Sequence, residues 1–150
     1  MKRFKVLFPR YAALLAIAAV VVVWPSLAET IALSAQSAAP APVSIKIHDF
    51  ATSAVTQVGT FVASGAIASS GAESQVIRVE GATLHCVHTL TAAEGTIVID
   101  SQCNLVQKAG QWRVVSGTGA YSGLKANGSL LMVFTNDPTE AYELLDGLVY

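Results

Sequence analysis

The sequence predicts an all-β domain that closes into an antiparallel barrel of about eight strands. Strand-like runs recur at short spacing, and no long helical period separates them. Between Trp112 and Phe134 the chain alternates like strands but is interrupted by Gly117, Gly119, Gly123 and Gly128, which indicate a sharply bent sheet. Closure also removes the exposed edges that several Val- and Ile-rich strands would present.

The first 28 residues have the pattern of a secretory signal peptide. Four basic residues precede an apolar run of 14 residues, from Tyr11 to Trp24, and small residues follow at Ser26 and Ala28. We expect cleavage after Ala28 and a secreted or periplasmic protein. An uncleaved N-terminal anchor is the alternative, although a membrane span needs roughly 18 or more apolar residues.

The charge balance of the remaining chain is mildly acidic. The full sequence has nine Lys and Arg against ten Asp and Glu, and the predicted signal contains four of the basic residues and none of the acidic ones. A chain with this balance lacks the basic surface that nucleic acids or anionic lipids require. We therefore expect no nucleic-acid partner and no membrane contact after signal cleavage.

Residues 29–43 are rich in Ala, Ser and Pro and are expected to form a flexible linker, with the barrel domain over 44–150. The first strand is expected over 44–50. A second, bent at a glycine, is expected over 55–67 and ends at Ser69-Ser70-Gly71, and a short third strand follows over 75–80.

Residues 83–91 and 96–106 are expected to form a hairpin. If Glu94-Gly95 is its two-residue loop, His88 faces Ser101 and Cys86 faces Cys103. The cysteine pair then falls on a non-hydrogen-bonded position, where the strands approach closely enough for a disulfide. Because an exported protein with two cysteines is expected to have them oxidised, we predict this disulfide, worth roughly 3 kcal/mol.

A metal site is the alternative interpretation of the same hairpin. Cys86, His88 and Cys103 share one face, and His85 is adjacent. The chain has no CxxC pair and the hairpin offers no fourth ligand, so we expect neither a metal nor a cofactor.

The last elements follow a polar turn at 107–110. Strands are expected on both sides of the glycine-rich bend, entering through Trp112 and leaving through Phe134. The tail, 137–150, has two interpretations. Asp137 followed by Pro138 and Glu140 is typical of a helix start, whereas Leu144, Leu145, Leu148 and Val149 could form the strand that closes the barrel.

The segment Gly117-Thr118-Gly119-Ala120-Tyr121, followed by Gly123-Leu124 and Gly128, resembles the exported bacterial proteins of the allene oxide cyclase and dirigent barrel-like group. The likeness covers roughly residues 44–134 and implies an eight-stranded, calycin-like barrel. Ala126 stands where the family has the first glycine of a corner. The family activities would be isomerisation of an epoxide or steering of radical coupling, but no polar catalytic residue of either family maps onto this chain.

Three residues are candidates for ligand contacts. His88 and Ser101 form a polar pair on the apolar, inward-facing side of the hairpin, and Tyr121 could place a hydroxyl at the barrel mouth. Each also has a structural interpretation: His88 and Ser101 could simply satisfy one another, and Tyr121 could pack over the glycine-rich corner.

Other polar residues give no recognisable catalytic pattern. His48 and Asp49 point to opposite faces of a strand, and Glu73, Glu80 and Asp100 have no spacing that pairs them. We therefore predict an exported barrel that binds a small apolar ligand or serves as an interaction module. A cyclase- or isomerase-type enzyme that uses the barrel cavity is the alternative.

Overall fold

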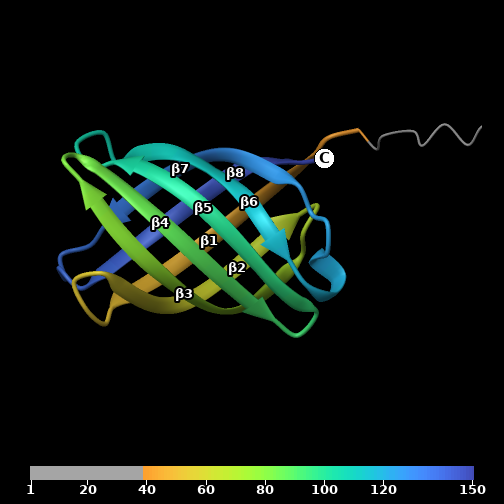
Figure 1. Ribbon diagram of the computed structural model, residues 1–150, viewed down its shortest axis with the longest axis horizontal. Coiled ribbons are helices and arrows are strands. Elements are labelled where there is room, and N and C mark those ends of the chain that lie inside the picture. Colours follow the sequence, from red (N-terminus) through yellow and green to blue (C-terminus); the bar gives the residue numbers. More distant parts are fainter. Residues whose placement is uncertain (1–38) are drawn as a thin grey trace, which may run out of the picture. The chain divides into compact units, whose positions relative to one another are not determined.

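A computed structural model describes residues 39–150 of the chain. It contains eight strands and one short 3-10 helix (Figure 1). The strands are β1 (Ala41–Ala51), β2 (Thr56–Gly65), β3 (Ser69–Glu80), β4 (Thr83–Ala92), β5 (Gly95–Asn104), β6 (Ala109–Gly117), β7 (Ala126–Phe134) and β8 (Glu140–Val149), and the 3-10 helix is η1 (Gly119–Tyr121). Among these residues, no helix has the length and hydrophobicity needed to cross a bilayer.

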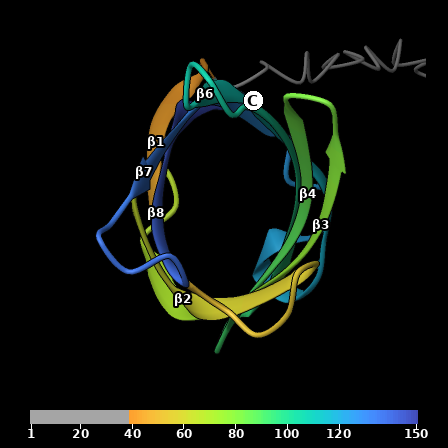
Figure 2. The same ribbon diagram turned by 90° about the vertical axis from the view of Figure 1, so that its left-hand side faces the viewer.

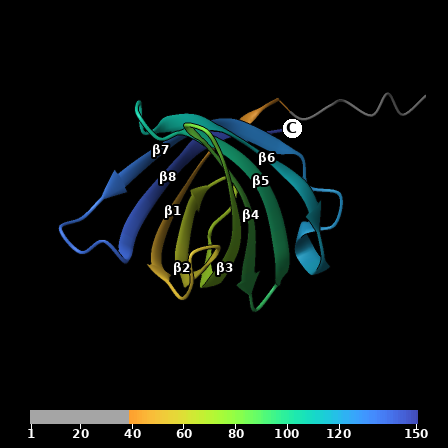
Figure 3. The same cartoon turned by 60° about the vertical axis from the view of Figure 1, so that its left-hand side comes forward.

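The strands form one closed antiparallel barrel in sequence order, which confirms the predicted fold class. Each strand pairs with its neighbours in the chain, and β1 also pairs with β8 over a long ladder from Ala41 opposite Val149 to Phe50 opposite Glu140. Viewed along its axis, the barrel is a continuous ring of strands (Figure 2). Its shortest ladder joins β6 to β7, which separate toward η1 (Figure 3).

The two ends of the barrel differ. The connections β1–β2, β3–β4, β5–β6 and β7–β8 lie at one end, which we call the cavity end, on the left in Figure 1. The connections β2–β3 and β4–β5 lie at the other end, together with η1 in the β6–β7 connection. We call this the η1 end. It also carries the C-terminus (Figure 1).

Side chains alternate between the interior and the surface along the strands, as the pleat requires. In β1, Val43, Ile45 and Ile47 are buried, and Lys46 between them faces out. The interior near the η1 end is apolar, and Leu90, Ile97, Ile99 and Leu145 are among its fully enclosed residues. Buried polar residues follow along the same inward faces toward the cavity end.

Two element boundaries differ from the sequence-based expectation, and the tail follows one of its two interpretations. β1 begins at Ala41, three residues before Ser44, because its ladder with β8 continues to Val149. β3 begins at Ser69, so the Ser-Ser-Gly segment starts a strand and does not end one. The tail forms β8, and Asp137 makes a turn in which its Oδ1 accepts from the backbone N–H of Thr139 at 2.8 Å. The predicted signal peptide and residues 29–38 of the linker lie outside the described residues.

The predicted disulfide is wrong, because the hairpin register differs. Ala93 and Glu94 form the turn, Gly95 pairs with Ala92, and Cys86 therefore faces Ser101 while Cys103 faces Leu84. Both cysteines are buried and free. They are diagonal neighbours on one face, typically about 7–8 Å apart, whereas a disulfide needs Cβ atoms about 3.5–4.5 Å apart. The inward face of the hairpin is as predicted, since the register changes by an even number of residues.

The glycine-rich segment brings the η1 connection against the β4–β5 turn. The backbone N–H of Ala120 donates to the carbonyl oxygen of Glu94 at 2.9 Å, and that of Thr118 donates to Thr96 at 2.9 Å. Gly119 has a positive φ of 59°, and a Cβ there would overlap the carbonyl oxygen of Glu94. Gly117 ends β6, Gly123 follows η1 and Gly128 lies within β7.

Candidate functional site

The barrel encloses a cluster of polar side chains that come from five strands. Its members are fully or almost fully buried and point inward at successive levels of the barrel: Asp49 from β1, Glu73 and Gln75 from β3, His88 from β4, Ser101 from β5 and Glu143 from β8. We call these six residues the interior polar cluster. Burying this many polar groups is costly unless they satisfy one another or bind a ligand.

His88 is the centre of the interior polar cluster. Its side chain is 0% exposed, and Nδ1 lies 3.1 Å from Oε1 of Glu73. On the other side of the ring, Nε2 lies 2.9 Å from Oγ of Ser101 and 3.6 Å from Oε2 of Glu143. The ring therefore has a carboxylate next to each nitrogen, and its orientation is fixed from both sides.

Gln75 connects the interior polar cluster to the cavity end. Its Nε2 donates to Oε1 of Glu143 at 3.2 Å and to Oε1 of Gln57 at 2.7 Å. Several buried acceptors have no hydrogen-bonding partner among the described residues. They are both carboxylate oxygens of Asp49, Oε2 of Glu73, Oε1 of Gln75 and Oε2 of Glu143. All of these are oxygens, so the interior has a surplus of acceptors over donors.

Burial and mutual repulsion change the protonation of the carboxyl groups. The pKa of Asp49 rises to about 9, first because of burial and then because of the neighbouring Glu73 and Glu143. Burial likewise raises the pKa of Glu143, although His88 and Gln75 oppose this shift. At neutral pH Asp49 therefore retains its proton, which reduces the negative charge inside the barrel.

His88 and Cys86 respond to the same environment. Burial by itself lowers the pKa of His88, but the charges of Glu143 and Glu73 outweigh this effect, and the net shift is upward. Cys86 is buried beside this group, and its pKa is raised by burial and by Glu143. Burial and Glu143 also raise the pKa of Cys103. Both thiols are therefore unreactive at neutral pH unless a cation stabilises the thiolate.

Cys86, His88 and Glu143 form the set of residues that could hold a metal ion. One ligand atom from each, Sγ, an imidazole nitrogen and a carboxylate oxygen, lies within 4.8 Å of the other two. The hairpin supplies two of these ligands, and β8 supplies the third. Cys103, which the sequence analysis placed in the alternative metal set, does not belong to this group.

A cavity of about 160 Å³ opens at the cavity end, next to the interior polar cluster. Eight of its lining residues are apolar, including Ile77, Leu84, Leu105, Met132 and Phe134, and three are polar, namely Gln57, Gln75 and Glu143. A larger depression of about 610 Å³ lies outside the barrel, over β5, β6 and β7, and surface residues such as Gln111 and Arg113 line it. Only the smaller cavity is in contact with buried polar groups of the cluster.

Tyr121 lies at the η1 end, opposite the cavity. Its hydroxyl donates to Oγ of Ser69 at 2.8 Å, and its ring packs against the apolar core. Tyr121 therefore anchors η1 to β3, which agrees with the structural interpretation of this residue. His88 and Ser101 do meet through a hydrogen bond, but the predicted direct pairing is wrong: His88 pairs with Ile99, and Ser101 is its diagonal neighbour. Tyr121 is not part of their site.

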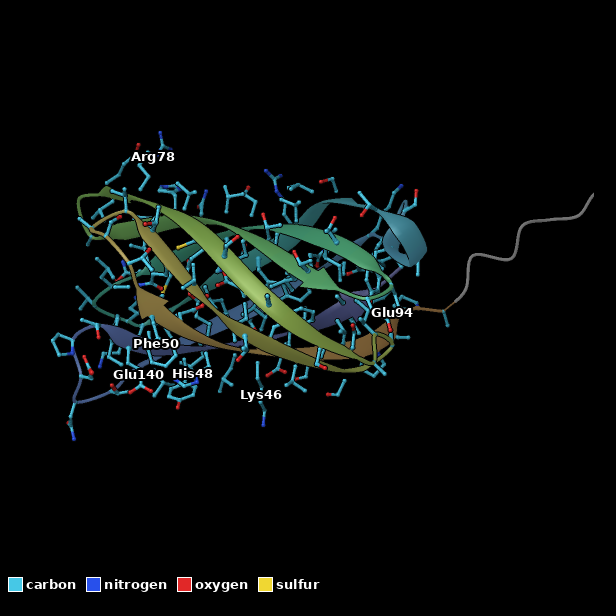
Figure 4. All side chains as sticks on the ribbon, turned by 90° about the horizontal axis from the view of Figure 1, so that it is seen from below. Lys46, His48, Phe50, Arg78, Glu94 and Glu140 are labelled. Atoms are coloured by element: carbon cyan, nitrogen blue, oxygen red, sulfur yellow. The ribbon has the colours of Figure 1, made fainter. Side chains whose placement is uncertain are left out.

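The outer face of β1 shows the alternation that separates surface from interior. Lys46, His48 and Phe50 lie in a row outside the barrel, with Glu140 next to His48 (Figure 4). Nε2 of His48 lies 2.6 Å from Oε1 of Glu140. Asp49, between His48 and Phe50, points inward and is 0% exposed. As predicted, His48 and Asp49 point to opposite faces of the strand.

The three acids of the interior polar cluster were given no site role from the sequence: Asp49 and Glu73 were considered without a pattern that pairs them, and Glu143 was not considered. A signal for two of them was present. Asp49 continues the inward series Val43, Ile45 and Ile47, and Glu143 lies between the inward residues Ala141 and Leu145. Their meeting depends on the pairing of β8 with β1, and from the sequence the tail could equally have been a helix.

Comparisons of this chain with protein-family models, with curated proteins and with solved structures give no match. What the described residues establish is therefore a closed, eight-stranded antiparallel β-barrel with a buried polar cluster beside an end cavity.

Proposed function

We propose that this chain is an exported barrel that binds a small, mostly apolar molecule in the cavity at its cavity end. The observation that carries the proposal is the composition of the cavity wall, which is mainly apolar but includes Gln75 and Glu143. Such a wall is typical of sites that bind by burial of apolar surface and orient the ligand with a few polar groups.

The polar atom of the ligand is expected to be a hydrogen-bond donor. Oε1 of Gln75 lacks a partner among the described residues, while its Nε2 is already used twice. A buried acceptor without a partner costs about 1–3 kcal/mol, which a hydroxyl or N–H group of the ligand would recover. At about 160 Å³, the cavity suits a molecule of roughly one ring, since a cavity of about 150 Å³ holds benzene.

An isomerase-type enzyme is the second candidate, and Glu143 favours it. Burial raises the pKa of the Glu143 carboxyl group, and a carboxyl group with a raised pKa beside an apolar cavity can act as a general acid. The resemblance of the glycine-rich segment to the allene oxide cyclase and dirigent barrel-like group is compatible with this alternative. It rests on residues that shape the barrel and on no shared catalytic group.

A matched ligand pair tests the binding proposal. Phenol and toluene have nearly the same shape, but only phenol can donate a hydrogen bond. We expect phenol to bind about tenfold more tightly, which corresponds to one satisfied acceptor. Ala141→Leu, which fills the cavity wall, is expected to abolish binding, whereas Val133→Leu on the exposed face of β7 is the control.

Nuclear magnetic resonance titration would show which residues respond. Shifts confined to the cavity end, absent in Ala141→Leu, would support the proposal. Shifts elsewhere, or equal affinities for the two ligands, would contradict it. Native mass spectrometry of protein purified from its own host would then identify the chemical class of a copurifying ligand. Conversion of that ligand by the wild type but not by Glu143→Gln would favour the enzyme.

A further inference from the structure

We propose that the barrel interior holds a divalent transition-metal ion, coordinated by Sγ of Cys86, Nε2 of His88 and Oε2 of Glu143. This inference goes beyond the ligand cavity and does not depend on it. It rests on the geometry of three side chains that come from two different parts of the chain.

The ligand atoms are already close to a coordinating arrangement. In a tetrahedral zinc site with bonds of about 2.0–2.3 Å, neighbouring ligand atoms lie roughly 3.3–3.8 Å apart. Nε2 of His88 and Oε2 of Glu143 are 3.6 Å apart, and all three ligand atoms lie within 4.8 Å of one another. No pair therefore has to close by more than about 1.5 Å. Rotation of a buried side chain within its rotamer well can supply such a movement.

The oxygen assigned to the metal is the one that lacks a partner. Oε1 of Glu143 accepts a hydrogen bond from Gln75, whereas Oε2 has no hydrogen-bonding partner among the described residues. Glu143 is 1% exposed, so water does not solvate this oxygen freely. An unpartnered carboxylate oxygen that faces an imidazole nitrogen and lies beside a thiol is well placed to bind a cation.

Two of the proposed ligands, His88 and Glu143, are hydrogen-bonded to further buried side chains, as metal ligands in proteins usually are. Glu73 lies 3.1 Å from Nδ1 of His88, on the side of the ring opposite the proposed ion. A carboxylate in this position accepts the Nδ1 proton and fixes the tautomer, so that Nε2 carries the lone pair. Nε2 lies 2.9 Å from Oγ of Ser101, and metal binding would replace this hydrogen bond with a bond to the ion. Gln75 orients Glu143 in the same way through its hydrogen bond to Oε1. His88 and Glu143 are therefore each oriented by a hydrogen bond with a neighbouring residue.

The charge of the interior also favours a cation. The buried ionisable residues comprise three carboxylic acids, two thiols and one histidine, and no lysine or arginine of residues 39–150 is buried. Buried carboxylates require a positive partner, which a divalent ion would supply more fully than one imidazole. An ion would also stabilise the thiolate of Cys86.

The donor set suggests which ion binds. Thiolate and imidazole together suit Zn²⁺ and related borderline ions, and hard oxygen-seeking ions such as Mg²⁺ avoid thiolate. Three protein ligands leave one tetrahedral position for a small molecule. Because Glu143 also lines the cavity, that position would lie near it. From the sequence, a metal was not expected because the hairpin offers no fourth ligand. In the structure Glu143 of β8 takes the place of Cys103 as the third ligand, and three protein ligands are enough for an open site.

Cobalt provides the most informative test, because Co²⁺ replaces Zn²⁺ and reports its ligands optically. The untagged full chain is first reduced and refolded with Co²⁺, so that access to the interior is not limiting. The refolded protein should bind one ion per chain. It should show a thiolate-to-cobalt charge-transfer band and the visible bands of tetrahedral cobalt. One equivalent of Zn²⁺ should abolish both signals.

The two cysteines provide a matched pair of variants. Cys86→Ser should lose the charge-transfer band, and Cys103→Ser, equally buried but outside the ligand group, should keep it. Glu143→Gln should weaken Zn²⁺ binding at least tenfold. Circular dichroism of each metal-free variant shows whether it folds. If Glu143→Gln does not fold, the comparison of Cys86→Ser with Cys103→Ser still tests the proposal.

Several outcomes would overturn the proposal. One is a refolded wild-type protein that shows no thiolate-to-cobalt charge-transfer band. Another is loss of the band in Cys103→Ser but not in Cys86→Ser. A third is Zn²⁺ affinity that is unchanged in a folded Glu143→Gln variant. Phenol binding without metal binding would contradict this proposal and leave the ligand cavity intact, so the two proposals can fail separately.

Discussion

Nδ1 of His88 lies 3.1 Å from Oε1 of Glu73, and both side chains are 0% exposed. This pair fixes the imidazole ring at the centre of the barrel, so that its other nitrogen faces Ser101 and Glu143. The orientation is the same whether His88 serves only to satisfy buried carboxylates or also binds a metal. Changes to Glu73 separate these roles.

Glu73→Gln is expected to reduce Zn²⁺ affinity by about 10–100-fold, because a carboxylate that holds a ligating histidine contributes about that much. The measurement is a competition titration with a chelator of known affinity. Glu80→Gln, at an exposed position on the same strand, is the control and should bind Zn²⁺ like the wild type. Equal affinities for Glu73→Gln and wild type, with both folded, would show that Glu73 does not position the ring.

The pH dependence of stability follows from Asp49. Its pKa in the folded protein is about 9, against an ordinary value of 3.8. Between these pH values the folded protein holds a proton that the unfolded chain has lost. The free energy of unfolding must therefore fall as pH rises, by up to about 1.4 kcal/mol per pH unit for this one group. The raised pKa values of Glu143 and His88 act in the same direction.

Urea unfolding of metal-free protein between pH 5 and pH 9 measures this slope. Asp49→Asn mimics the protonated acid and should be more stable than wild type at high pH, with a smaller slope. Asp100→Asn removes a partly exposed carboxylate that pairs with Arg113. Because its charge is the smallest of the contributions that raise the pKa of His88, this variant should change the slope much less than Asp49→Asn does. Stability of the wild type that rises from pH 5 to pH 9 would contradict the assigned protonation.

The two cysteines are expected to be reduced. Denatured protein that has never met a reductant should react with two equivalents of a thiol reagent, because the register keeps Cys86 and Cys103 diagonal. The melting temperature should also be the same with and without reductant. A chain that gives no thiol reaction before reduction would show that the two sulfurs had joined and that the hairpin register is wrong.

Gly119 is a glycine whose replacement should be costly. Alanine there would take a positive φ and overlap the carbonyl oxygen of Glu94, so we expect a loss of more than about 2 kcal/mol. Gly123 also has a positive φ, 76°, but a Cβ there would meet open space. Gly123→Ala should thus cost only about 1–2 kcal/mol. Comparable losses for the two variants, measured by urea unfolding, would mean that the η1 contact contributes little.

The fold could be predicted because its signals are local. Alternation of apolar residues marked the strands, and the short connections between them favoured antiparallel neighbours. The hairpin register could not be predicted, because it depends on contacts with another segment. Gly95 follows the turn and does not belong to it, and a Cβ there would overlap the carbonyl oxygen of Thr118, twenty-odd residues along the chain.

The candidate site could be predicted only in part, for the same reason. His88 and Ser101 lie on one hairpin, so alternation alone placed them on the same inward face. Glu143 joins them because β8 pairs with β1 and closes the barrel, and the tail could equally have been a helix. The acids inside the barrel could therefore not be brought together from the sequence, although Asp49 and Glu143 each follow the inward alternation of their own strand.

Anomalous X-ray scattering at the zinc edge, from crystals of reduced full chain grown with Zn²⁺, tests the central claim most directly. We predict a single strong peak inside the barrel, about 2.3 Å from Sγ of Cys86 and about 2.0–2.2 Å from Nε2 of His88 and Oε2 of Glu143. A barrel interior without a peak, or a peak bound only by surface histidines such as His48, would contradict it.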